Sequence, residues 1–459
     1  MKFDNTSIAT EMRAIINSGP KKVHGYYYSK LYIKGKIYSP HKIGNIDVFA
    51  DYLNNYCDEI LVDLYLSPGM YENDIIPNKE NIEIKIFRKV MREGEDTEDI
   101  TDGVRVIEGR LVLTDTNNQF FANQTSANKK ETRDLMGIQK VSFQIVNPIL
   151  EAFRMQSTGG IFRLVSGIDV VRTVLLNVTN ANDVDESYKI KGVDIAPNFN
   201  NEKKTHINIP HGTKVLDLPD YINKNIEGIY SAGLGFYLKK DIWYIYPTYD
   251  VDRFNNANKT LTVLRIPTDV LPVMDRTFLA NGNNVTIIVN KQVSLIDGSD
   301  IEQQNLGNGL RFTDARSMME DFVKIDGNKA TASRGKNVNE FMIEKRDTKL
   351  NNIVSPGSKI SSNMFYEMSN LAKRNGSIVD VLWEYSDASL LYPGMPVRFM
   401  TQQGDGISVN YGVLLASHET IMLEGKGITA SKHKTSCNLS IFVKRKIKWN
   451  EENVNTIEV

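Results

Sequence analysis

Two stretches near the start of the chain carry apolar side chains at every second position. Apolar residues occupy every second position of 60–66, and isoleucines do so at 82–86, with Glu83 and Lys85 between them. A period of two places alternate side chains on opposite faces of a strand. These stretches therefore predict antiparallel strands with one face in water.

The segments around these strands predict hairpins and connections. Residues 26–40 indicate a hairpin that turns near 34–36, and residues 103–115, which contain Gly109, indicate a second one. A helix or a turn is predicted for residues 46–56. Residues 67–80 are predicted to form a loop, because their prolines and glycine would disrupt a ladder.

Outside residues 207–250, apolar residues at helical spacing predict four helices. The clearest has one face formed by Ile168, Val171, Val174, Leu175 and Val178. A short N-terminal helix is predicted to begin at Ser7 and to end before Gly19. The other two are predicted at 314–324 and from Ser361 or Ser362 to Gly376.

The most informative stretch covers residues 207–250, INIPHGTKVLDLPDYINKNIEGIYSAGLGFYLKKDIWYIYPTYD. It reads as a strand, then an amphipathic helix with Pro219 in its first turn, then a glycine stop at Gly228. An aromatic hairpin follows, with Phe236 and Tyr237 in one run and three aromatics in the other. Such residues favour a pleated, half-buried surface.

The remaining chain predicts further strands and completes the fold class. Residues 260–267, 284–290 and most of 380–449 have strand character, while 120–134 is polar and indicates an exposed loop. The prediction is a mainly β protein with a few helices (α+β), in several barrel- or sandwich-like modules that form a tube-like ring. Four parts are expected: a β-rich tube-type module (1–135), an α/β middle segment with the aromatic hairpin (136–270), a mixed module (271–376) and a C-terminal β module (377–459).

The bulk composition is that of a globular protein without a strong charge. Of 459 residues, 41% are hydrophobic and 24% charged, and the formal net charge is −1. Nucleic-acid-binding proteins normally carry a basic excess, so specific nucleic-acid binding is not expected. The two cysteines, Cys57 and Cys437, suit a reducing compartment, although a single bridge between them stays open. Residues 1–20 do not resemble a signal peptide and no run spans a membrane, so folding in a cytoplasm is expected.

The sequence offers little catalytic or ligand-binding chemistry. His206 and His211 are five residues apart on a predicted strand, where the spacing points them to opposite faces, so a metal pair is not expected. No serine-nucleophile or phosphate-loop motif occurs, and the glycines at 233 and 235 precede a strand, which excludes a dinucleotide fingerprint. The basic residues Arg334 and Lys336 are interpreted as part of a solvated loop. We therefore predict no catalytic, cofactor-binding or metal-ligating residue, no cofactor and no enzymatic activity.

The order of elements resembles the hub protein of contractile-tail phage baseplates, a family that includes hubs of R-type pyocins and of type VI secretion spikes. The likeness is carried by the helix at 169–175, by VDIAPNFN (193–200), by INIPHGTKVLDLPDYI, and by the GIY turn and WYIYPTYD strand that follow. The C-terminal YPGMPVRF and YGVLLASHETIML are similar to the late β-domain of such proteins.

This resemblance implies a structural virion protein that adapts the tail tube to a trimeric spike. It implies a homotrimer with two β-modules per chain in a six-fold-like ring, and contacts with tail spike, tail tube and baseplate wedge proteins. Its place would be the tail baseplate, assembled in the host cytoplasm. Two alternatives stay open: another baseplate component such as a wedge or fibre adaptor, and a tail-borne cell-wall or polysaccharide hydrolase, which needs two carboxylates in one pocket.

Overall fold

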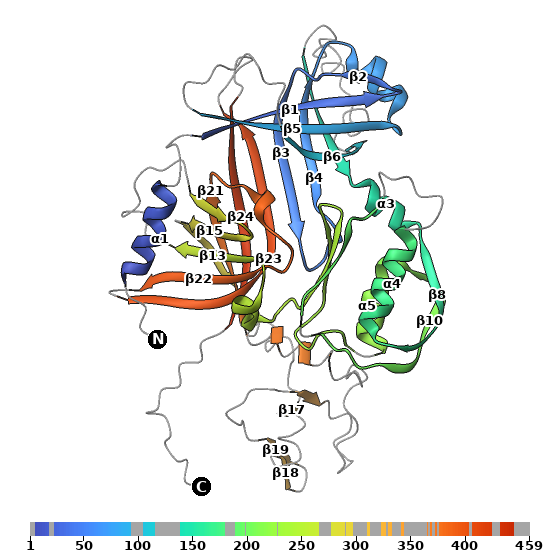
Figure 1. Cartoon of the computed structure of the whole chain (residues 1–459), viewed down its shortest axis with the longest axis vertical. Coiled ribbons are helices and arrows are strands. Elements are labelled where there is room, and N and C mark those ends of the chain that lie inside the picture. Colours follow the sequence, from blue (N-terminus) through green and yellow to red (C-terminus); the bar gives the residue numbers. More distant parts are fainter. Residues whose placement is uncertain are drawn as a thin grey trace.

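The structure is a computed structural model of the whole chain (Figure 1). It describes residues 5–17, 23–92, 104–114, 138–179, 189–197, 199–226, 228–265, 277–289, 291–296, 310–312, 323–326, 329–332, 341–343, 365, 368–369, 372–373, 376–403, 406–424 and 432–444.

The described part is mainly β with a few helices, as the sequence predicts. The helical elements are α1 (Asn5–Asn17), η1 (Tyr71–Ile75), η2 (Ile76–Asn78), α3 (Pro148–Arg154), α4 (Gly167–Thr179), η6 (Val215–Asp217), α5 (Leu218–Asn225), η7 (Val251–Asn256) and η8 (Ala388–Leu390). The strands of the first half are β1 (Val23–Ile33), β2 (Lys36–Tyr38), β3 (Lys42–Asp51), β4 (Glu59–Leu66), β5 (Ile82–Arg92), β6 (Val104–Leu113), β7 (Gln139–Val146), β8 (Ser157–Val165), β9 (Gly192–Ile195), β10 (Lys204–Lys214), β11 (Gly235–Lys239) and β12 (Ile242–Tyr246). Those of the second half are β13 (Thr260–Arg265), β14 (Phe278–Asn281), β15 (Asn284–Val289), β16 (Lys291–Ile296), β17 (Leu310–Phe312), β18 (Val323–Asp326), β19 (Lys329–Ala332), β20 (Phe341–Ile343), β21 (Gly376–Glu384), β22 (Pro396–Gln403), β23 (Gly406–Leu423) and β24 (His433–Lys444).

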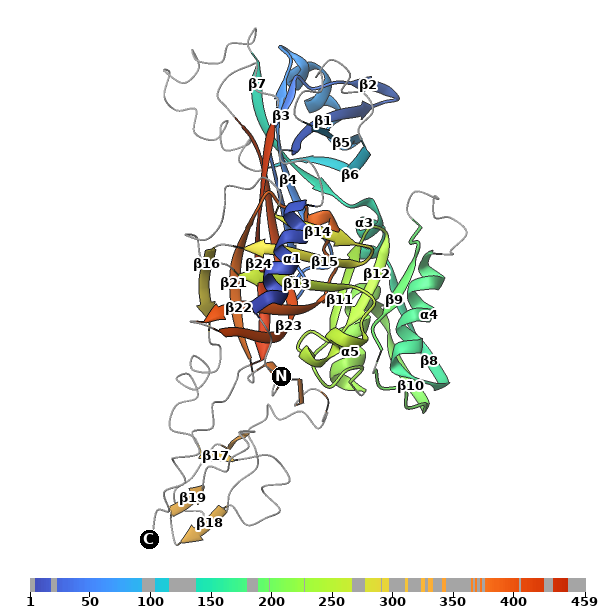
Figure 2. The ribbon, with the colours of Figure 1, turned by 60° about the vertical axis from the view of Figure 1, so that its left-hand side comes forward.

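One mixed sheet of 15 strands unites the two ends of the chain (Figures 1 and 2). Its order is β14-β15-β13-β22-β23-β3-β4-β7-β6-β5-β1-β24-β21-β16, and β2 pairs with β1. The long strand β23 pairs with β3 on one side and with β24 on the other. Because β24 also meets β1 through the pair Gly25–His433, the strands from β3 to β1 close into a partial ring with β23 and β24. The structure shows a single chain, and the tube-like ring assembly stays a prediction.

The alternating stretches form the expected strands with one buried face. Val62, Leu64, Ile82, Ile84 and Ile86 are almost fully buried in one core cluster beneath β1, β4, β5 and β7. The hairpin at 26–40 is also confirmed, as β1 and β2 pair around a turn. Its turn residues Lys34 and Gly35 both have positive φ, as a tight two-residue connection with the right twist requires.

Three local predictions near the N-terminus are wrong, and each has a physical cause. Residues 46–51 belong to strand β3, whose bulge between Ile43 and Ile46 hides the period of two; only the stretch after Asp51 is a turn. Residues 104–113 form one continuous strand instead of a hairpin. Gly109 marks no turn there: a Cβ at this position would collide with the carbonyl of Val146 on β7. The predicted loop at 67–80 contains η1 and η2, which bury Tyr71 and Ile75.

The helices, the strand and the aromatic hairpin predicted for residues 168–250 are present. Helices α4 and α5 pack over a core that includes Val171, Leu175 and Ile222, and the ribbon β8–β10 lies beside them (Figure 1). Hairpin β11–β12 pairs with β9, and α3 begins at the Asn147 cap, whose side chain accepts from two backbone N–H groups.

The C-terminal strands and the remaining helices agree only in part with the elements predicted from the sequence. The strands expected at 260–267 and 284–290 are β13 and β15, and those expected after 380 are β21 to β24, although Leu390 ends η8 and residues 391–395 connect it to β22. Helix α1 is confirmed, but it includes Asn5 and Thr6, so Ser7 does not begin it. The helix at 314–324 lies mostly outside the described residues, and Val323 and Lys324 are in β18. Only a few residues of the helix predicted at 361–376 are described. Gly376, which was expected to end that helix, is the first residue of β21. The loop at 120–134 also lies outside the described residues, and the four proposed domain limits stay a prediction.

Candidate functional site

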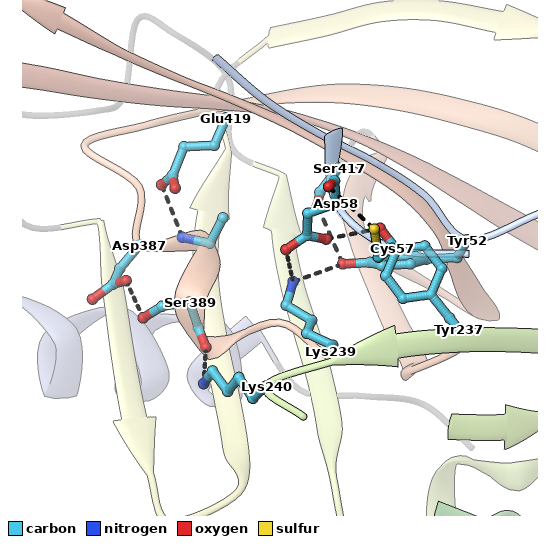
Figure 3. A network of polar contacts seen from close by, with 11 residues as sticks. Tyr52, Cys57, Asp58, Tyr237, Lys239, Lys240, Asp387, Ser389, Ser417 and Glu419 are labelled. Atoms are coloured by element: carbon cyan, nitrogen blue, oxygen red, sulfur yellow. Dashed lines mark hydrogen bonds and ion pairs between the residues drawn. The ribbon is translucent and has the colours of Figure 1, made fainter. Parts of the chain in front are cut away.

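A pocket of about 310 Å³ lies where three parts of the chain meet. Its lining comes from the N-terminal strands, from the tip of hairpin β11–β12, and from η8 with the neighbouring strand β23. Its lining includes the apolar side chains of Ile60, Ile107 and Ile145 and the polar side chains of Lys239 and Glu419, and Figure 3 shows the contacts of the polar ones. A concave site with an apolar wall and a few convergent polar groups is the usual form of a ligand or catalytic site.

The hairpin tip is built by two residues in the left-handed region. Lys240 and Asp241 have φ of 51° and 63°, the pattern of a two-residue turn whose twist matches the flanking strands. The tip directs Lys239 and Lys240 to different sides (Figure 3). Lys240 donates from Nζ to the carbonyl of Ser389 at 2.6 Å, and Lys239 donates to the hydroxyl of Tyr52 at 3.2 Å. The tip therefore joins strand β3 to the segment at η8.

Lys239 is a buried cation that lies between the hydroxyl of Tyr52 and the carboxylate of Asp58. Its Nζ lies 4.0 Å from a carboxylate oxygen of Asp58, and its side chain is only 8% exposed. Burial alone would lower the pKa of Lys239, but Asp58 and the Tyr52 hydroxyl outweigh burial and raise it above its ordinary value. An ammonium stabilised in this way remains protonated at neutral pH and cannot act as a nucleophile or a base.

Asp58 and Tyr52 are in turn fixed by aromatic residues of the hairpin. The hydroxyl of Tyr237 donates to Asp58 at 2.7 Å, and the hydroxyl of Tyr246 donates to the carbonyl of Tyr52 at 2.8 Å. The Tyr52 hydroxyl also lies 3.3 Å from that of Ser417 on β23. Burial, followed by the charge of Asp58, raises the pKa of Tyr237, so this phenol serves as a neutral donor. The cluster is a network that links β3, β11, β12 and β23.

Among the carboxyl groups that line the pocket, Glu419 accepts hydrogen bonds from neutral donors. Its Oε1 accepts from the backbone N–H of Ala388 at 2.9 Å and from the hydroxyl of Ser386 at 3.2 Å. Burial is the main cause that raises the pKa of Glu419 above its ordinary value. Next to it, Arg88 of β5 forms an ion pair of 2.9 Å with Asp387.

Each of the other acidic residues on the described pocket wall has a cationic partner. These pairs are Lys239–Asp58, Arg88–Asp387, Arg105–Glu108 and Lys191–Asp241. Burial raises the pKa of the Cys57 thiol to about 12, which keeps it protonated and unreactive at neutral pH. The arrangement therefore joins chain segments, and among the described residues it presents no activated nucleophile.

The residues singled out in the sequence are dispersed. His206 and His211 are both exposed on β10, and the described residues contain no group of three or more metal-ligating side chains. Arg334 and Lys336 lie outside the described residues. Tyr230, Trp243, Tyr244 and Tyr246 are 5% exposed or less, so these aromatic side chains serve in packing. No described helix is long and apolar enough to cross a membrane.

Sequence reasoning missed the pocket itself. Tyr52, Asp58, Lys239 and Glu419 come from three distant stretches, and only pairing brings them together. One local signal existed: the Lys-Lys-Asp sequence at the tip of an otherwise aromatic hairpin.

No family model and no curated protein sequence matches the chain. Among solved structures it is similar to the 43 kDa tail protein of prophage MuSo2 from Shewanella oneidensis, with 11% identity, a TM-score of 0.44, and coverage of 90% of this chain and 96% of that one. It is also similar to the E. coli c3393 protein, described as a component of the type VI secretion system, with 9% identity, a TM-score of 0.41, and coverage of 91% and 77%. A chain of the Francisella PdpA–VgrG complex has 11% identity and a TM-score of 0.34, and this chain spans 61% of it. Each of these similarities extends over 90% or more of this chain.

Proposed function

We propose that this chain is a structural protein of a contractile phage tail and, within it, the baseplate hub that adapts the tail tube to the spike. The observation that carries the proposal is the ordered series from α4 through β10, α5 and the aromatic hairpin, which resembles hub proteins in sequence. Its aromatic side chains are used for packing, so this series serves as a framework.

Two features of the fold support a framework role. The polar groups of the pocket hold β3, β11, β23 and η8 together, which suits a rigid part that transmits force. The path of the large sheet ends in β14 and β16, whose outer edges offer backbone groups for pairing with a neighbour. In this role the chain acts as a homotrimer in the tail baseplate, is assembled in the host cytoplasm, and contacts tube, spike and wedge proteins.

Light scattering on the purified protein, alone and with the tube and spike proteins of the same particle, tests this function. The proposal expects about three times the monomer mass of 51.9 kDa, alone or on addition of the spike. A strict monomer at micromolar concentration that binds neither protein would contradict it.

A different baseplate part is distinguished by stoichiometry, because a wedge or fibre adaptor would be present in about six copies for each set of three spike chains. For the hydrolase alternative, the candidate active site is the pocket lined by Glu419 and Asp387. Turnover of peptidoglycan or capsule by the isolated chain, lost in Glu419→Gln, would favour it over the hub.

A further inference from the structure

The ribbon of β8 and β10 lies at the margin of the molecule in both views (Figures 1 and 2). The two strands pair with each other, and neither pairs with a further strand of the described chain. One face of the ribbon is closed, because Ile207 and Ile209 are buried in the core beneath α4 and α5. A strand without a second neighbour presents backbone N–H and C=O groups along its edge, and another strand can add there.

The outer edge of β10 is poorly suited to such pairing. The strand bulges between Ile209 and Thr213, and it contains Pro210, which has no N–H to donate. The carbonyl of Asn208 accepts from the hydroxyl of Tyr221 on α5 at 3.5 Å. Bulges and prolines are devices by which proteins prevent pairing at an edge. The sequence of β8, STGGIFRLV, contains neither proline nor lysine, so its edge is the one suited to pairing.

Two large apolar side chains of β8 lie outside the core. Ile161 is 63% exposed and Leu164 is 69% exposed. Leu164 also has a φ of 53°, a left-handed conformation that is unfavourable for a bulky side chain. Backbone strain of this kind gathers at binding and switch sites, where the surrounding structure maintains it. The strand thus holds exposed apolar side chains beside its edge, and they are available to a partner.

The ribbon has basic side chains and no acidic one. β8 and β10 contain Arg163, Lys204, Lys214, His206 and His211, and no aspartate or glutamate. Arg163 and Lys214 are exposed and form no ion pair within the part of the chain that the structure describes. The whole protein is balanced at a net charge of −1, so this excess is local. Charge complementarity therefore favours an acidic partner.

We propose that the outer edge of β8 is a docking site for an extended, acidic segment of a partner protein, which adds to the ribbon as a third strand. Backbone groups of β8 supply most of the affinity. Ile161, Arg163 and Leu164 select apolar and acidic side chains on the incoming strand. The inference goes beyond the proposed function and does not depend on it, because strand addition requires neither a trimer nor a spike.

Peptide binding to the full-length protein tests this inference. Because backbone pairing supplies most of the affinity, the probe is a fluorescent peptide as long as β8 in which glutamate and valine alternate. Fluorescence anisotropy measures its affinity. The same peptide methylated at every backbone nitrogen cannot donate hydrogen bonds and should bind at least about tenfold more weakly. A peptide with lysine in place of glutamate should also bind about tenfold more weakly.

Variants of the protein locate the binding to the ribbon. Arg163→Glu with Lys214→Glu should reverse the preference, so that the lysine peptide binds about tenfold more tightly than the glutamate peptide. Lys79→Glu, at an exposed lysine just after η2, is the matched control and should leave the preference unchanged. Leu164→Gly removes the backbone strain, so the melting temperature should stay the same or rise while peptide affinity falls about fivefold.

Hydrogen exchange identifies the mode of binding. The glutamate peptide should protect backbone amides of residues 160–165, and this protection should be absent with the methylated peptide. Equal binding of the methylated peptide would show attraction of anions without strand pairing and would overturn the inference. So would the absence of peptide binding at about 1 mM, or sedimentation with phosphatidylglycerol vesicles in place of peptide binding, which would assign the ribbon to an anionic membrane surface. None of these results bears on the hub proposal, which depends on the mass of the assembly.

Discussion

Lys239 donates to the hydroxyl of Tyr52 at 3.2 Å, although the two residues are 187 positions apart. The contact places a buried cation of the aromatic hairpin against the end of β3. It is the centre of the network that holds the hairpin between the N-terminal and C-terminal strands.

Loss of this cation should destabilise the fold strongly. Lys239→Met leaves Asp58 near the pocket without its ammonium partner, and loss of one member of a buried pair costs about 3 kcal/mol. The matched control is Lys191→Met, which removes an exposed cation from Asp241 and should cost under about 1 kcal/mol. Urea unfolding of both variants measures the difference; equal effects would mean that the network does not hold the fold together.

Glu419 makes stability depend on pH. Because burial raises the pKa of this carboxyl, the folded chain keeps its proton to higher pH than the unfolded chain does. Its contribution to stability is therefore fully present below the ordinary value of 4.5 and is lost as pH rises from there through the raised value. We expect Glu419→Gln to unfold at a higher temperature than the wild type at pH 8, with a gain that shrinks as pH falls. Glu424→Gln, at an exposed carboxylate just beyond β23, should show no such trend.

Cys57 should be a slow thiol in the folded protein. With its pKa raised to about 12 by burial, its thiolate fraction at pH 8 is about a thousandfold below that of a free cysteine. Labelling with iodoacetamide, followed by peptide mass spectrometry to separate Cys57 from Cys437, should therefore be slow until denaturant is added. Rapid labelling of Cys57 in the folded state would show that the strand end at the pocket is open.

Gly394 tests the packing behind the hairpin. It has a φ of +62°, and a Cβ there would collide with the ring of Tyr246. Gly282 has a similar φ of +60° but faces open space. Gly282→Ala should cost about 1 to 2 kcal/mol for backbone strain alone, and Gly394→Ala about 2 kcal/mol more for overpacking. Similar unfolding free energies for the two variants would contradict the described contact.

The sequence was most informative where one face of an element is wet. Isoleucines such as Ile82 and Ile84 alternate with charged residues, which predicts a strand. The aromatic composition of the hairpin likewise predicts strands. It was least informative where a glycine or a bulge serves tertiary contact, as at Gly109 and in β3. The pocket could not be predicted because Asp58, Lys239 and Glu419 meet only through pairings of β3, β23 and the hairpin, and local periodicity carries no information on such distant partners.

The most direct test of the central claim is electron cryo-microscopy of the particle that contains this chain. The hub proposal predicts three copies around the tail axis, between the tube and the spike, with the aromatic hairpin inside each subunit. Density for the chain away from the axis, or in six copies at the periphery, would contradict it.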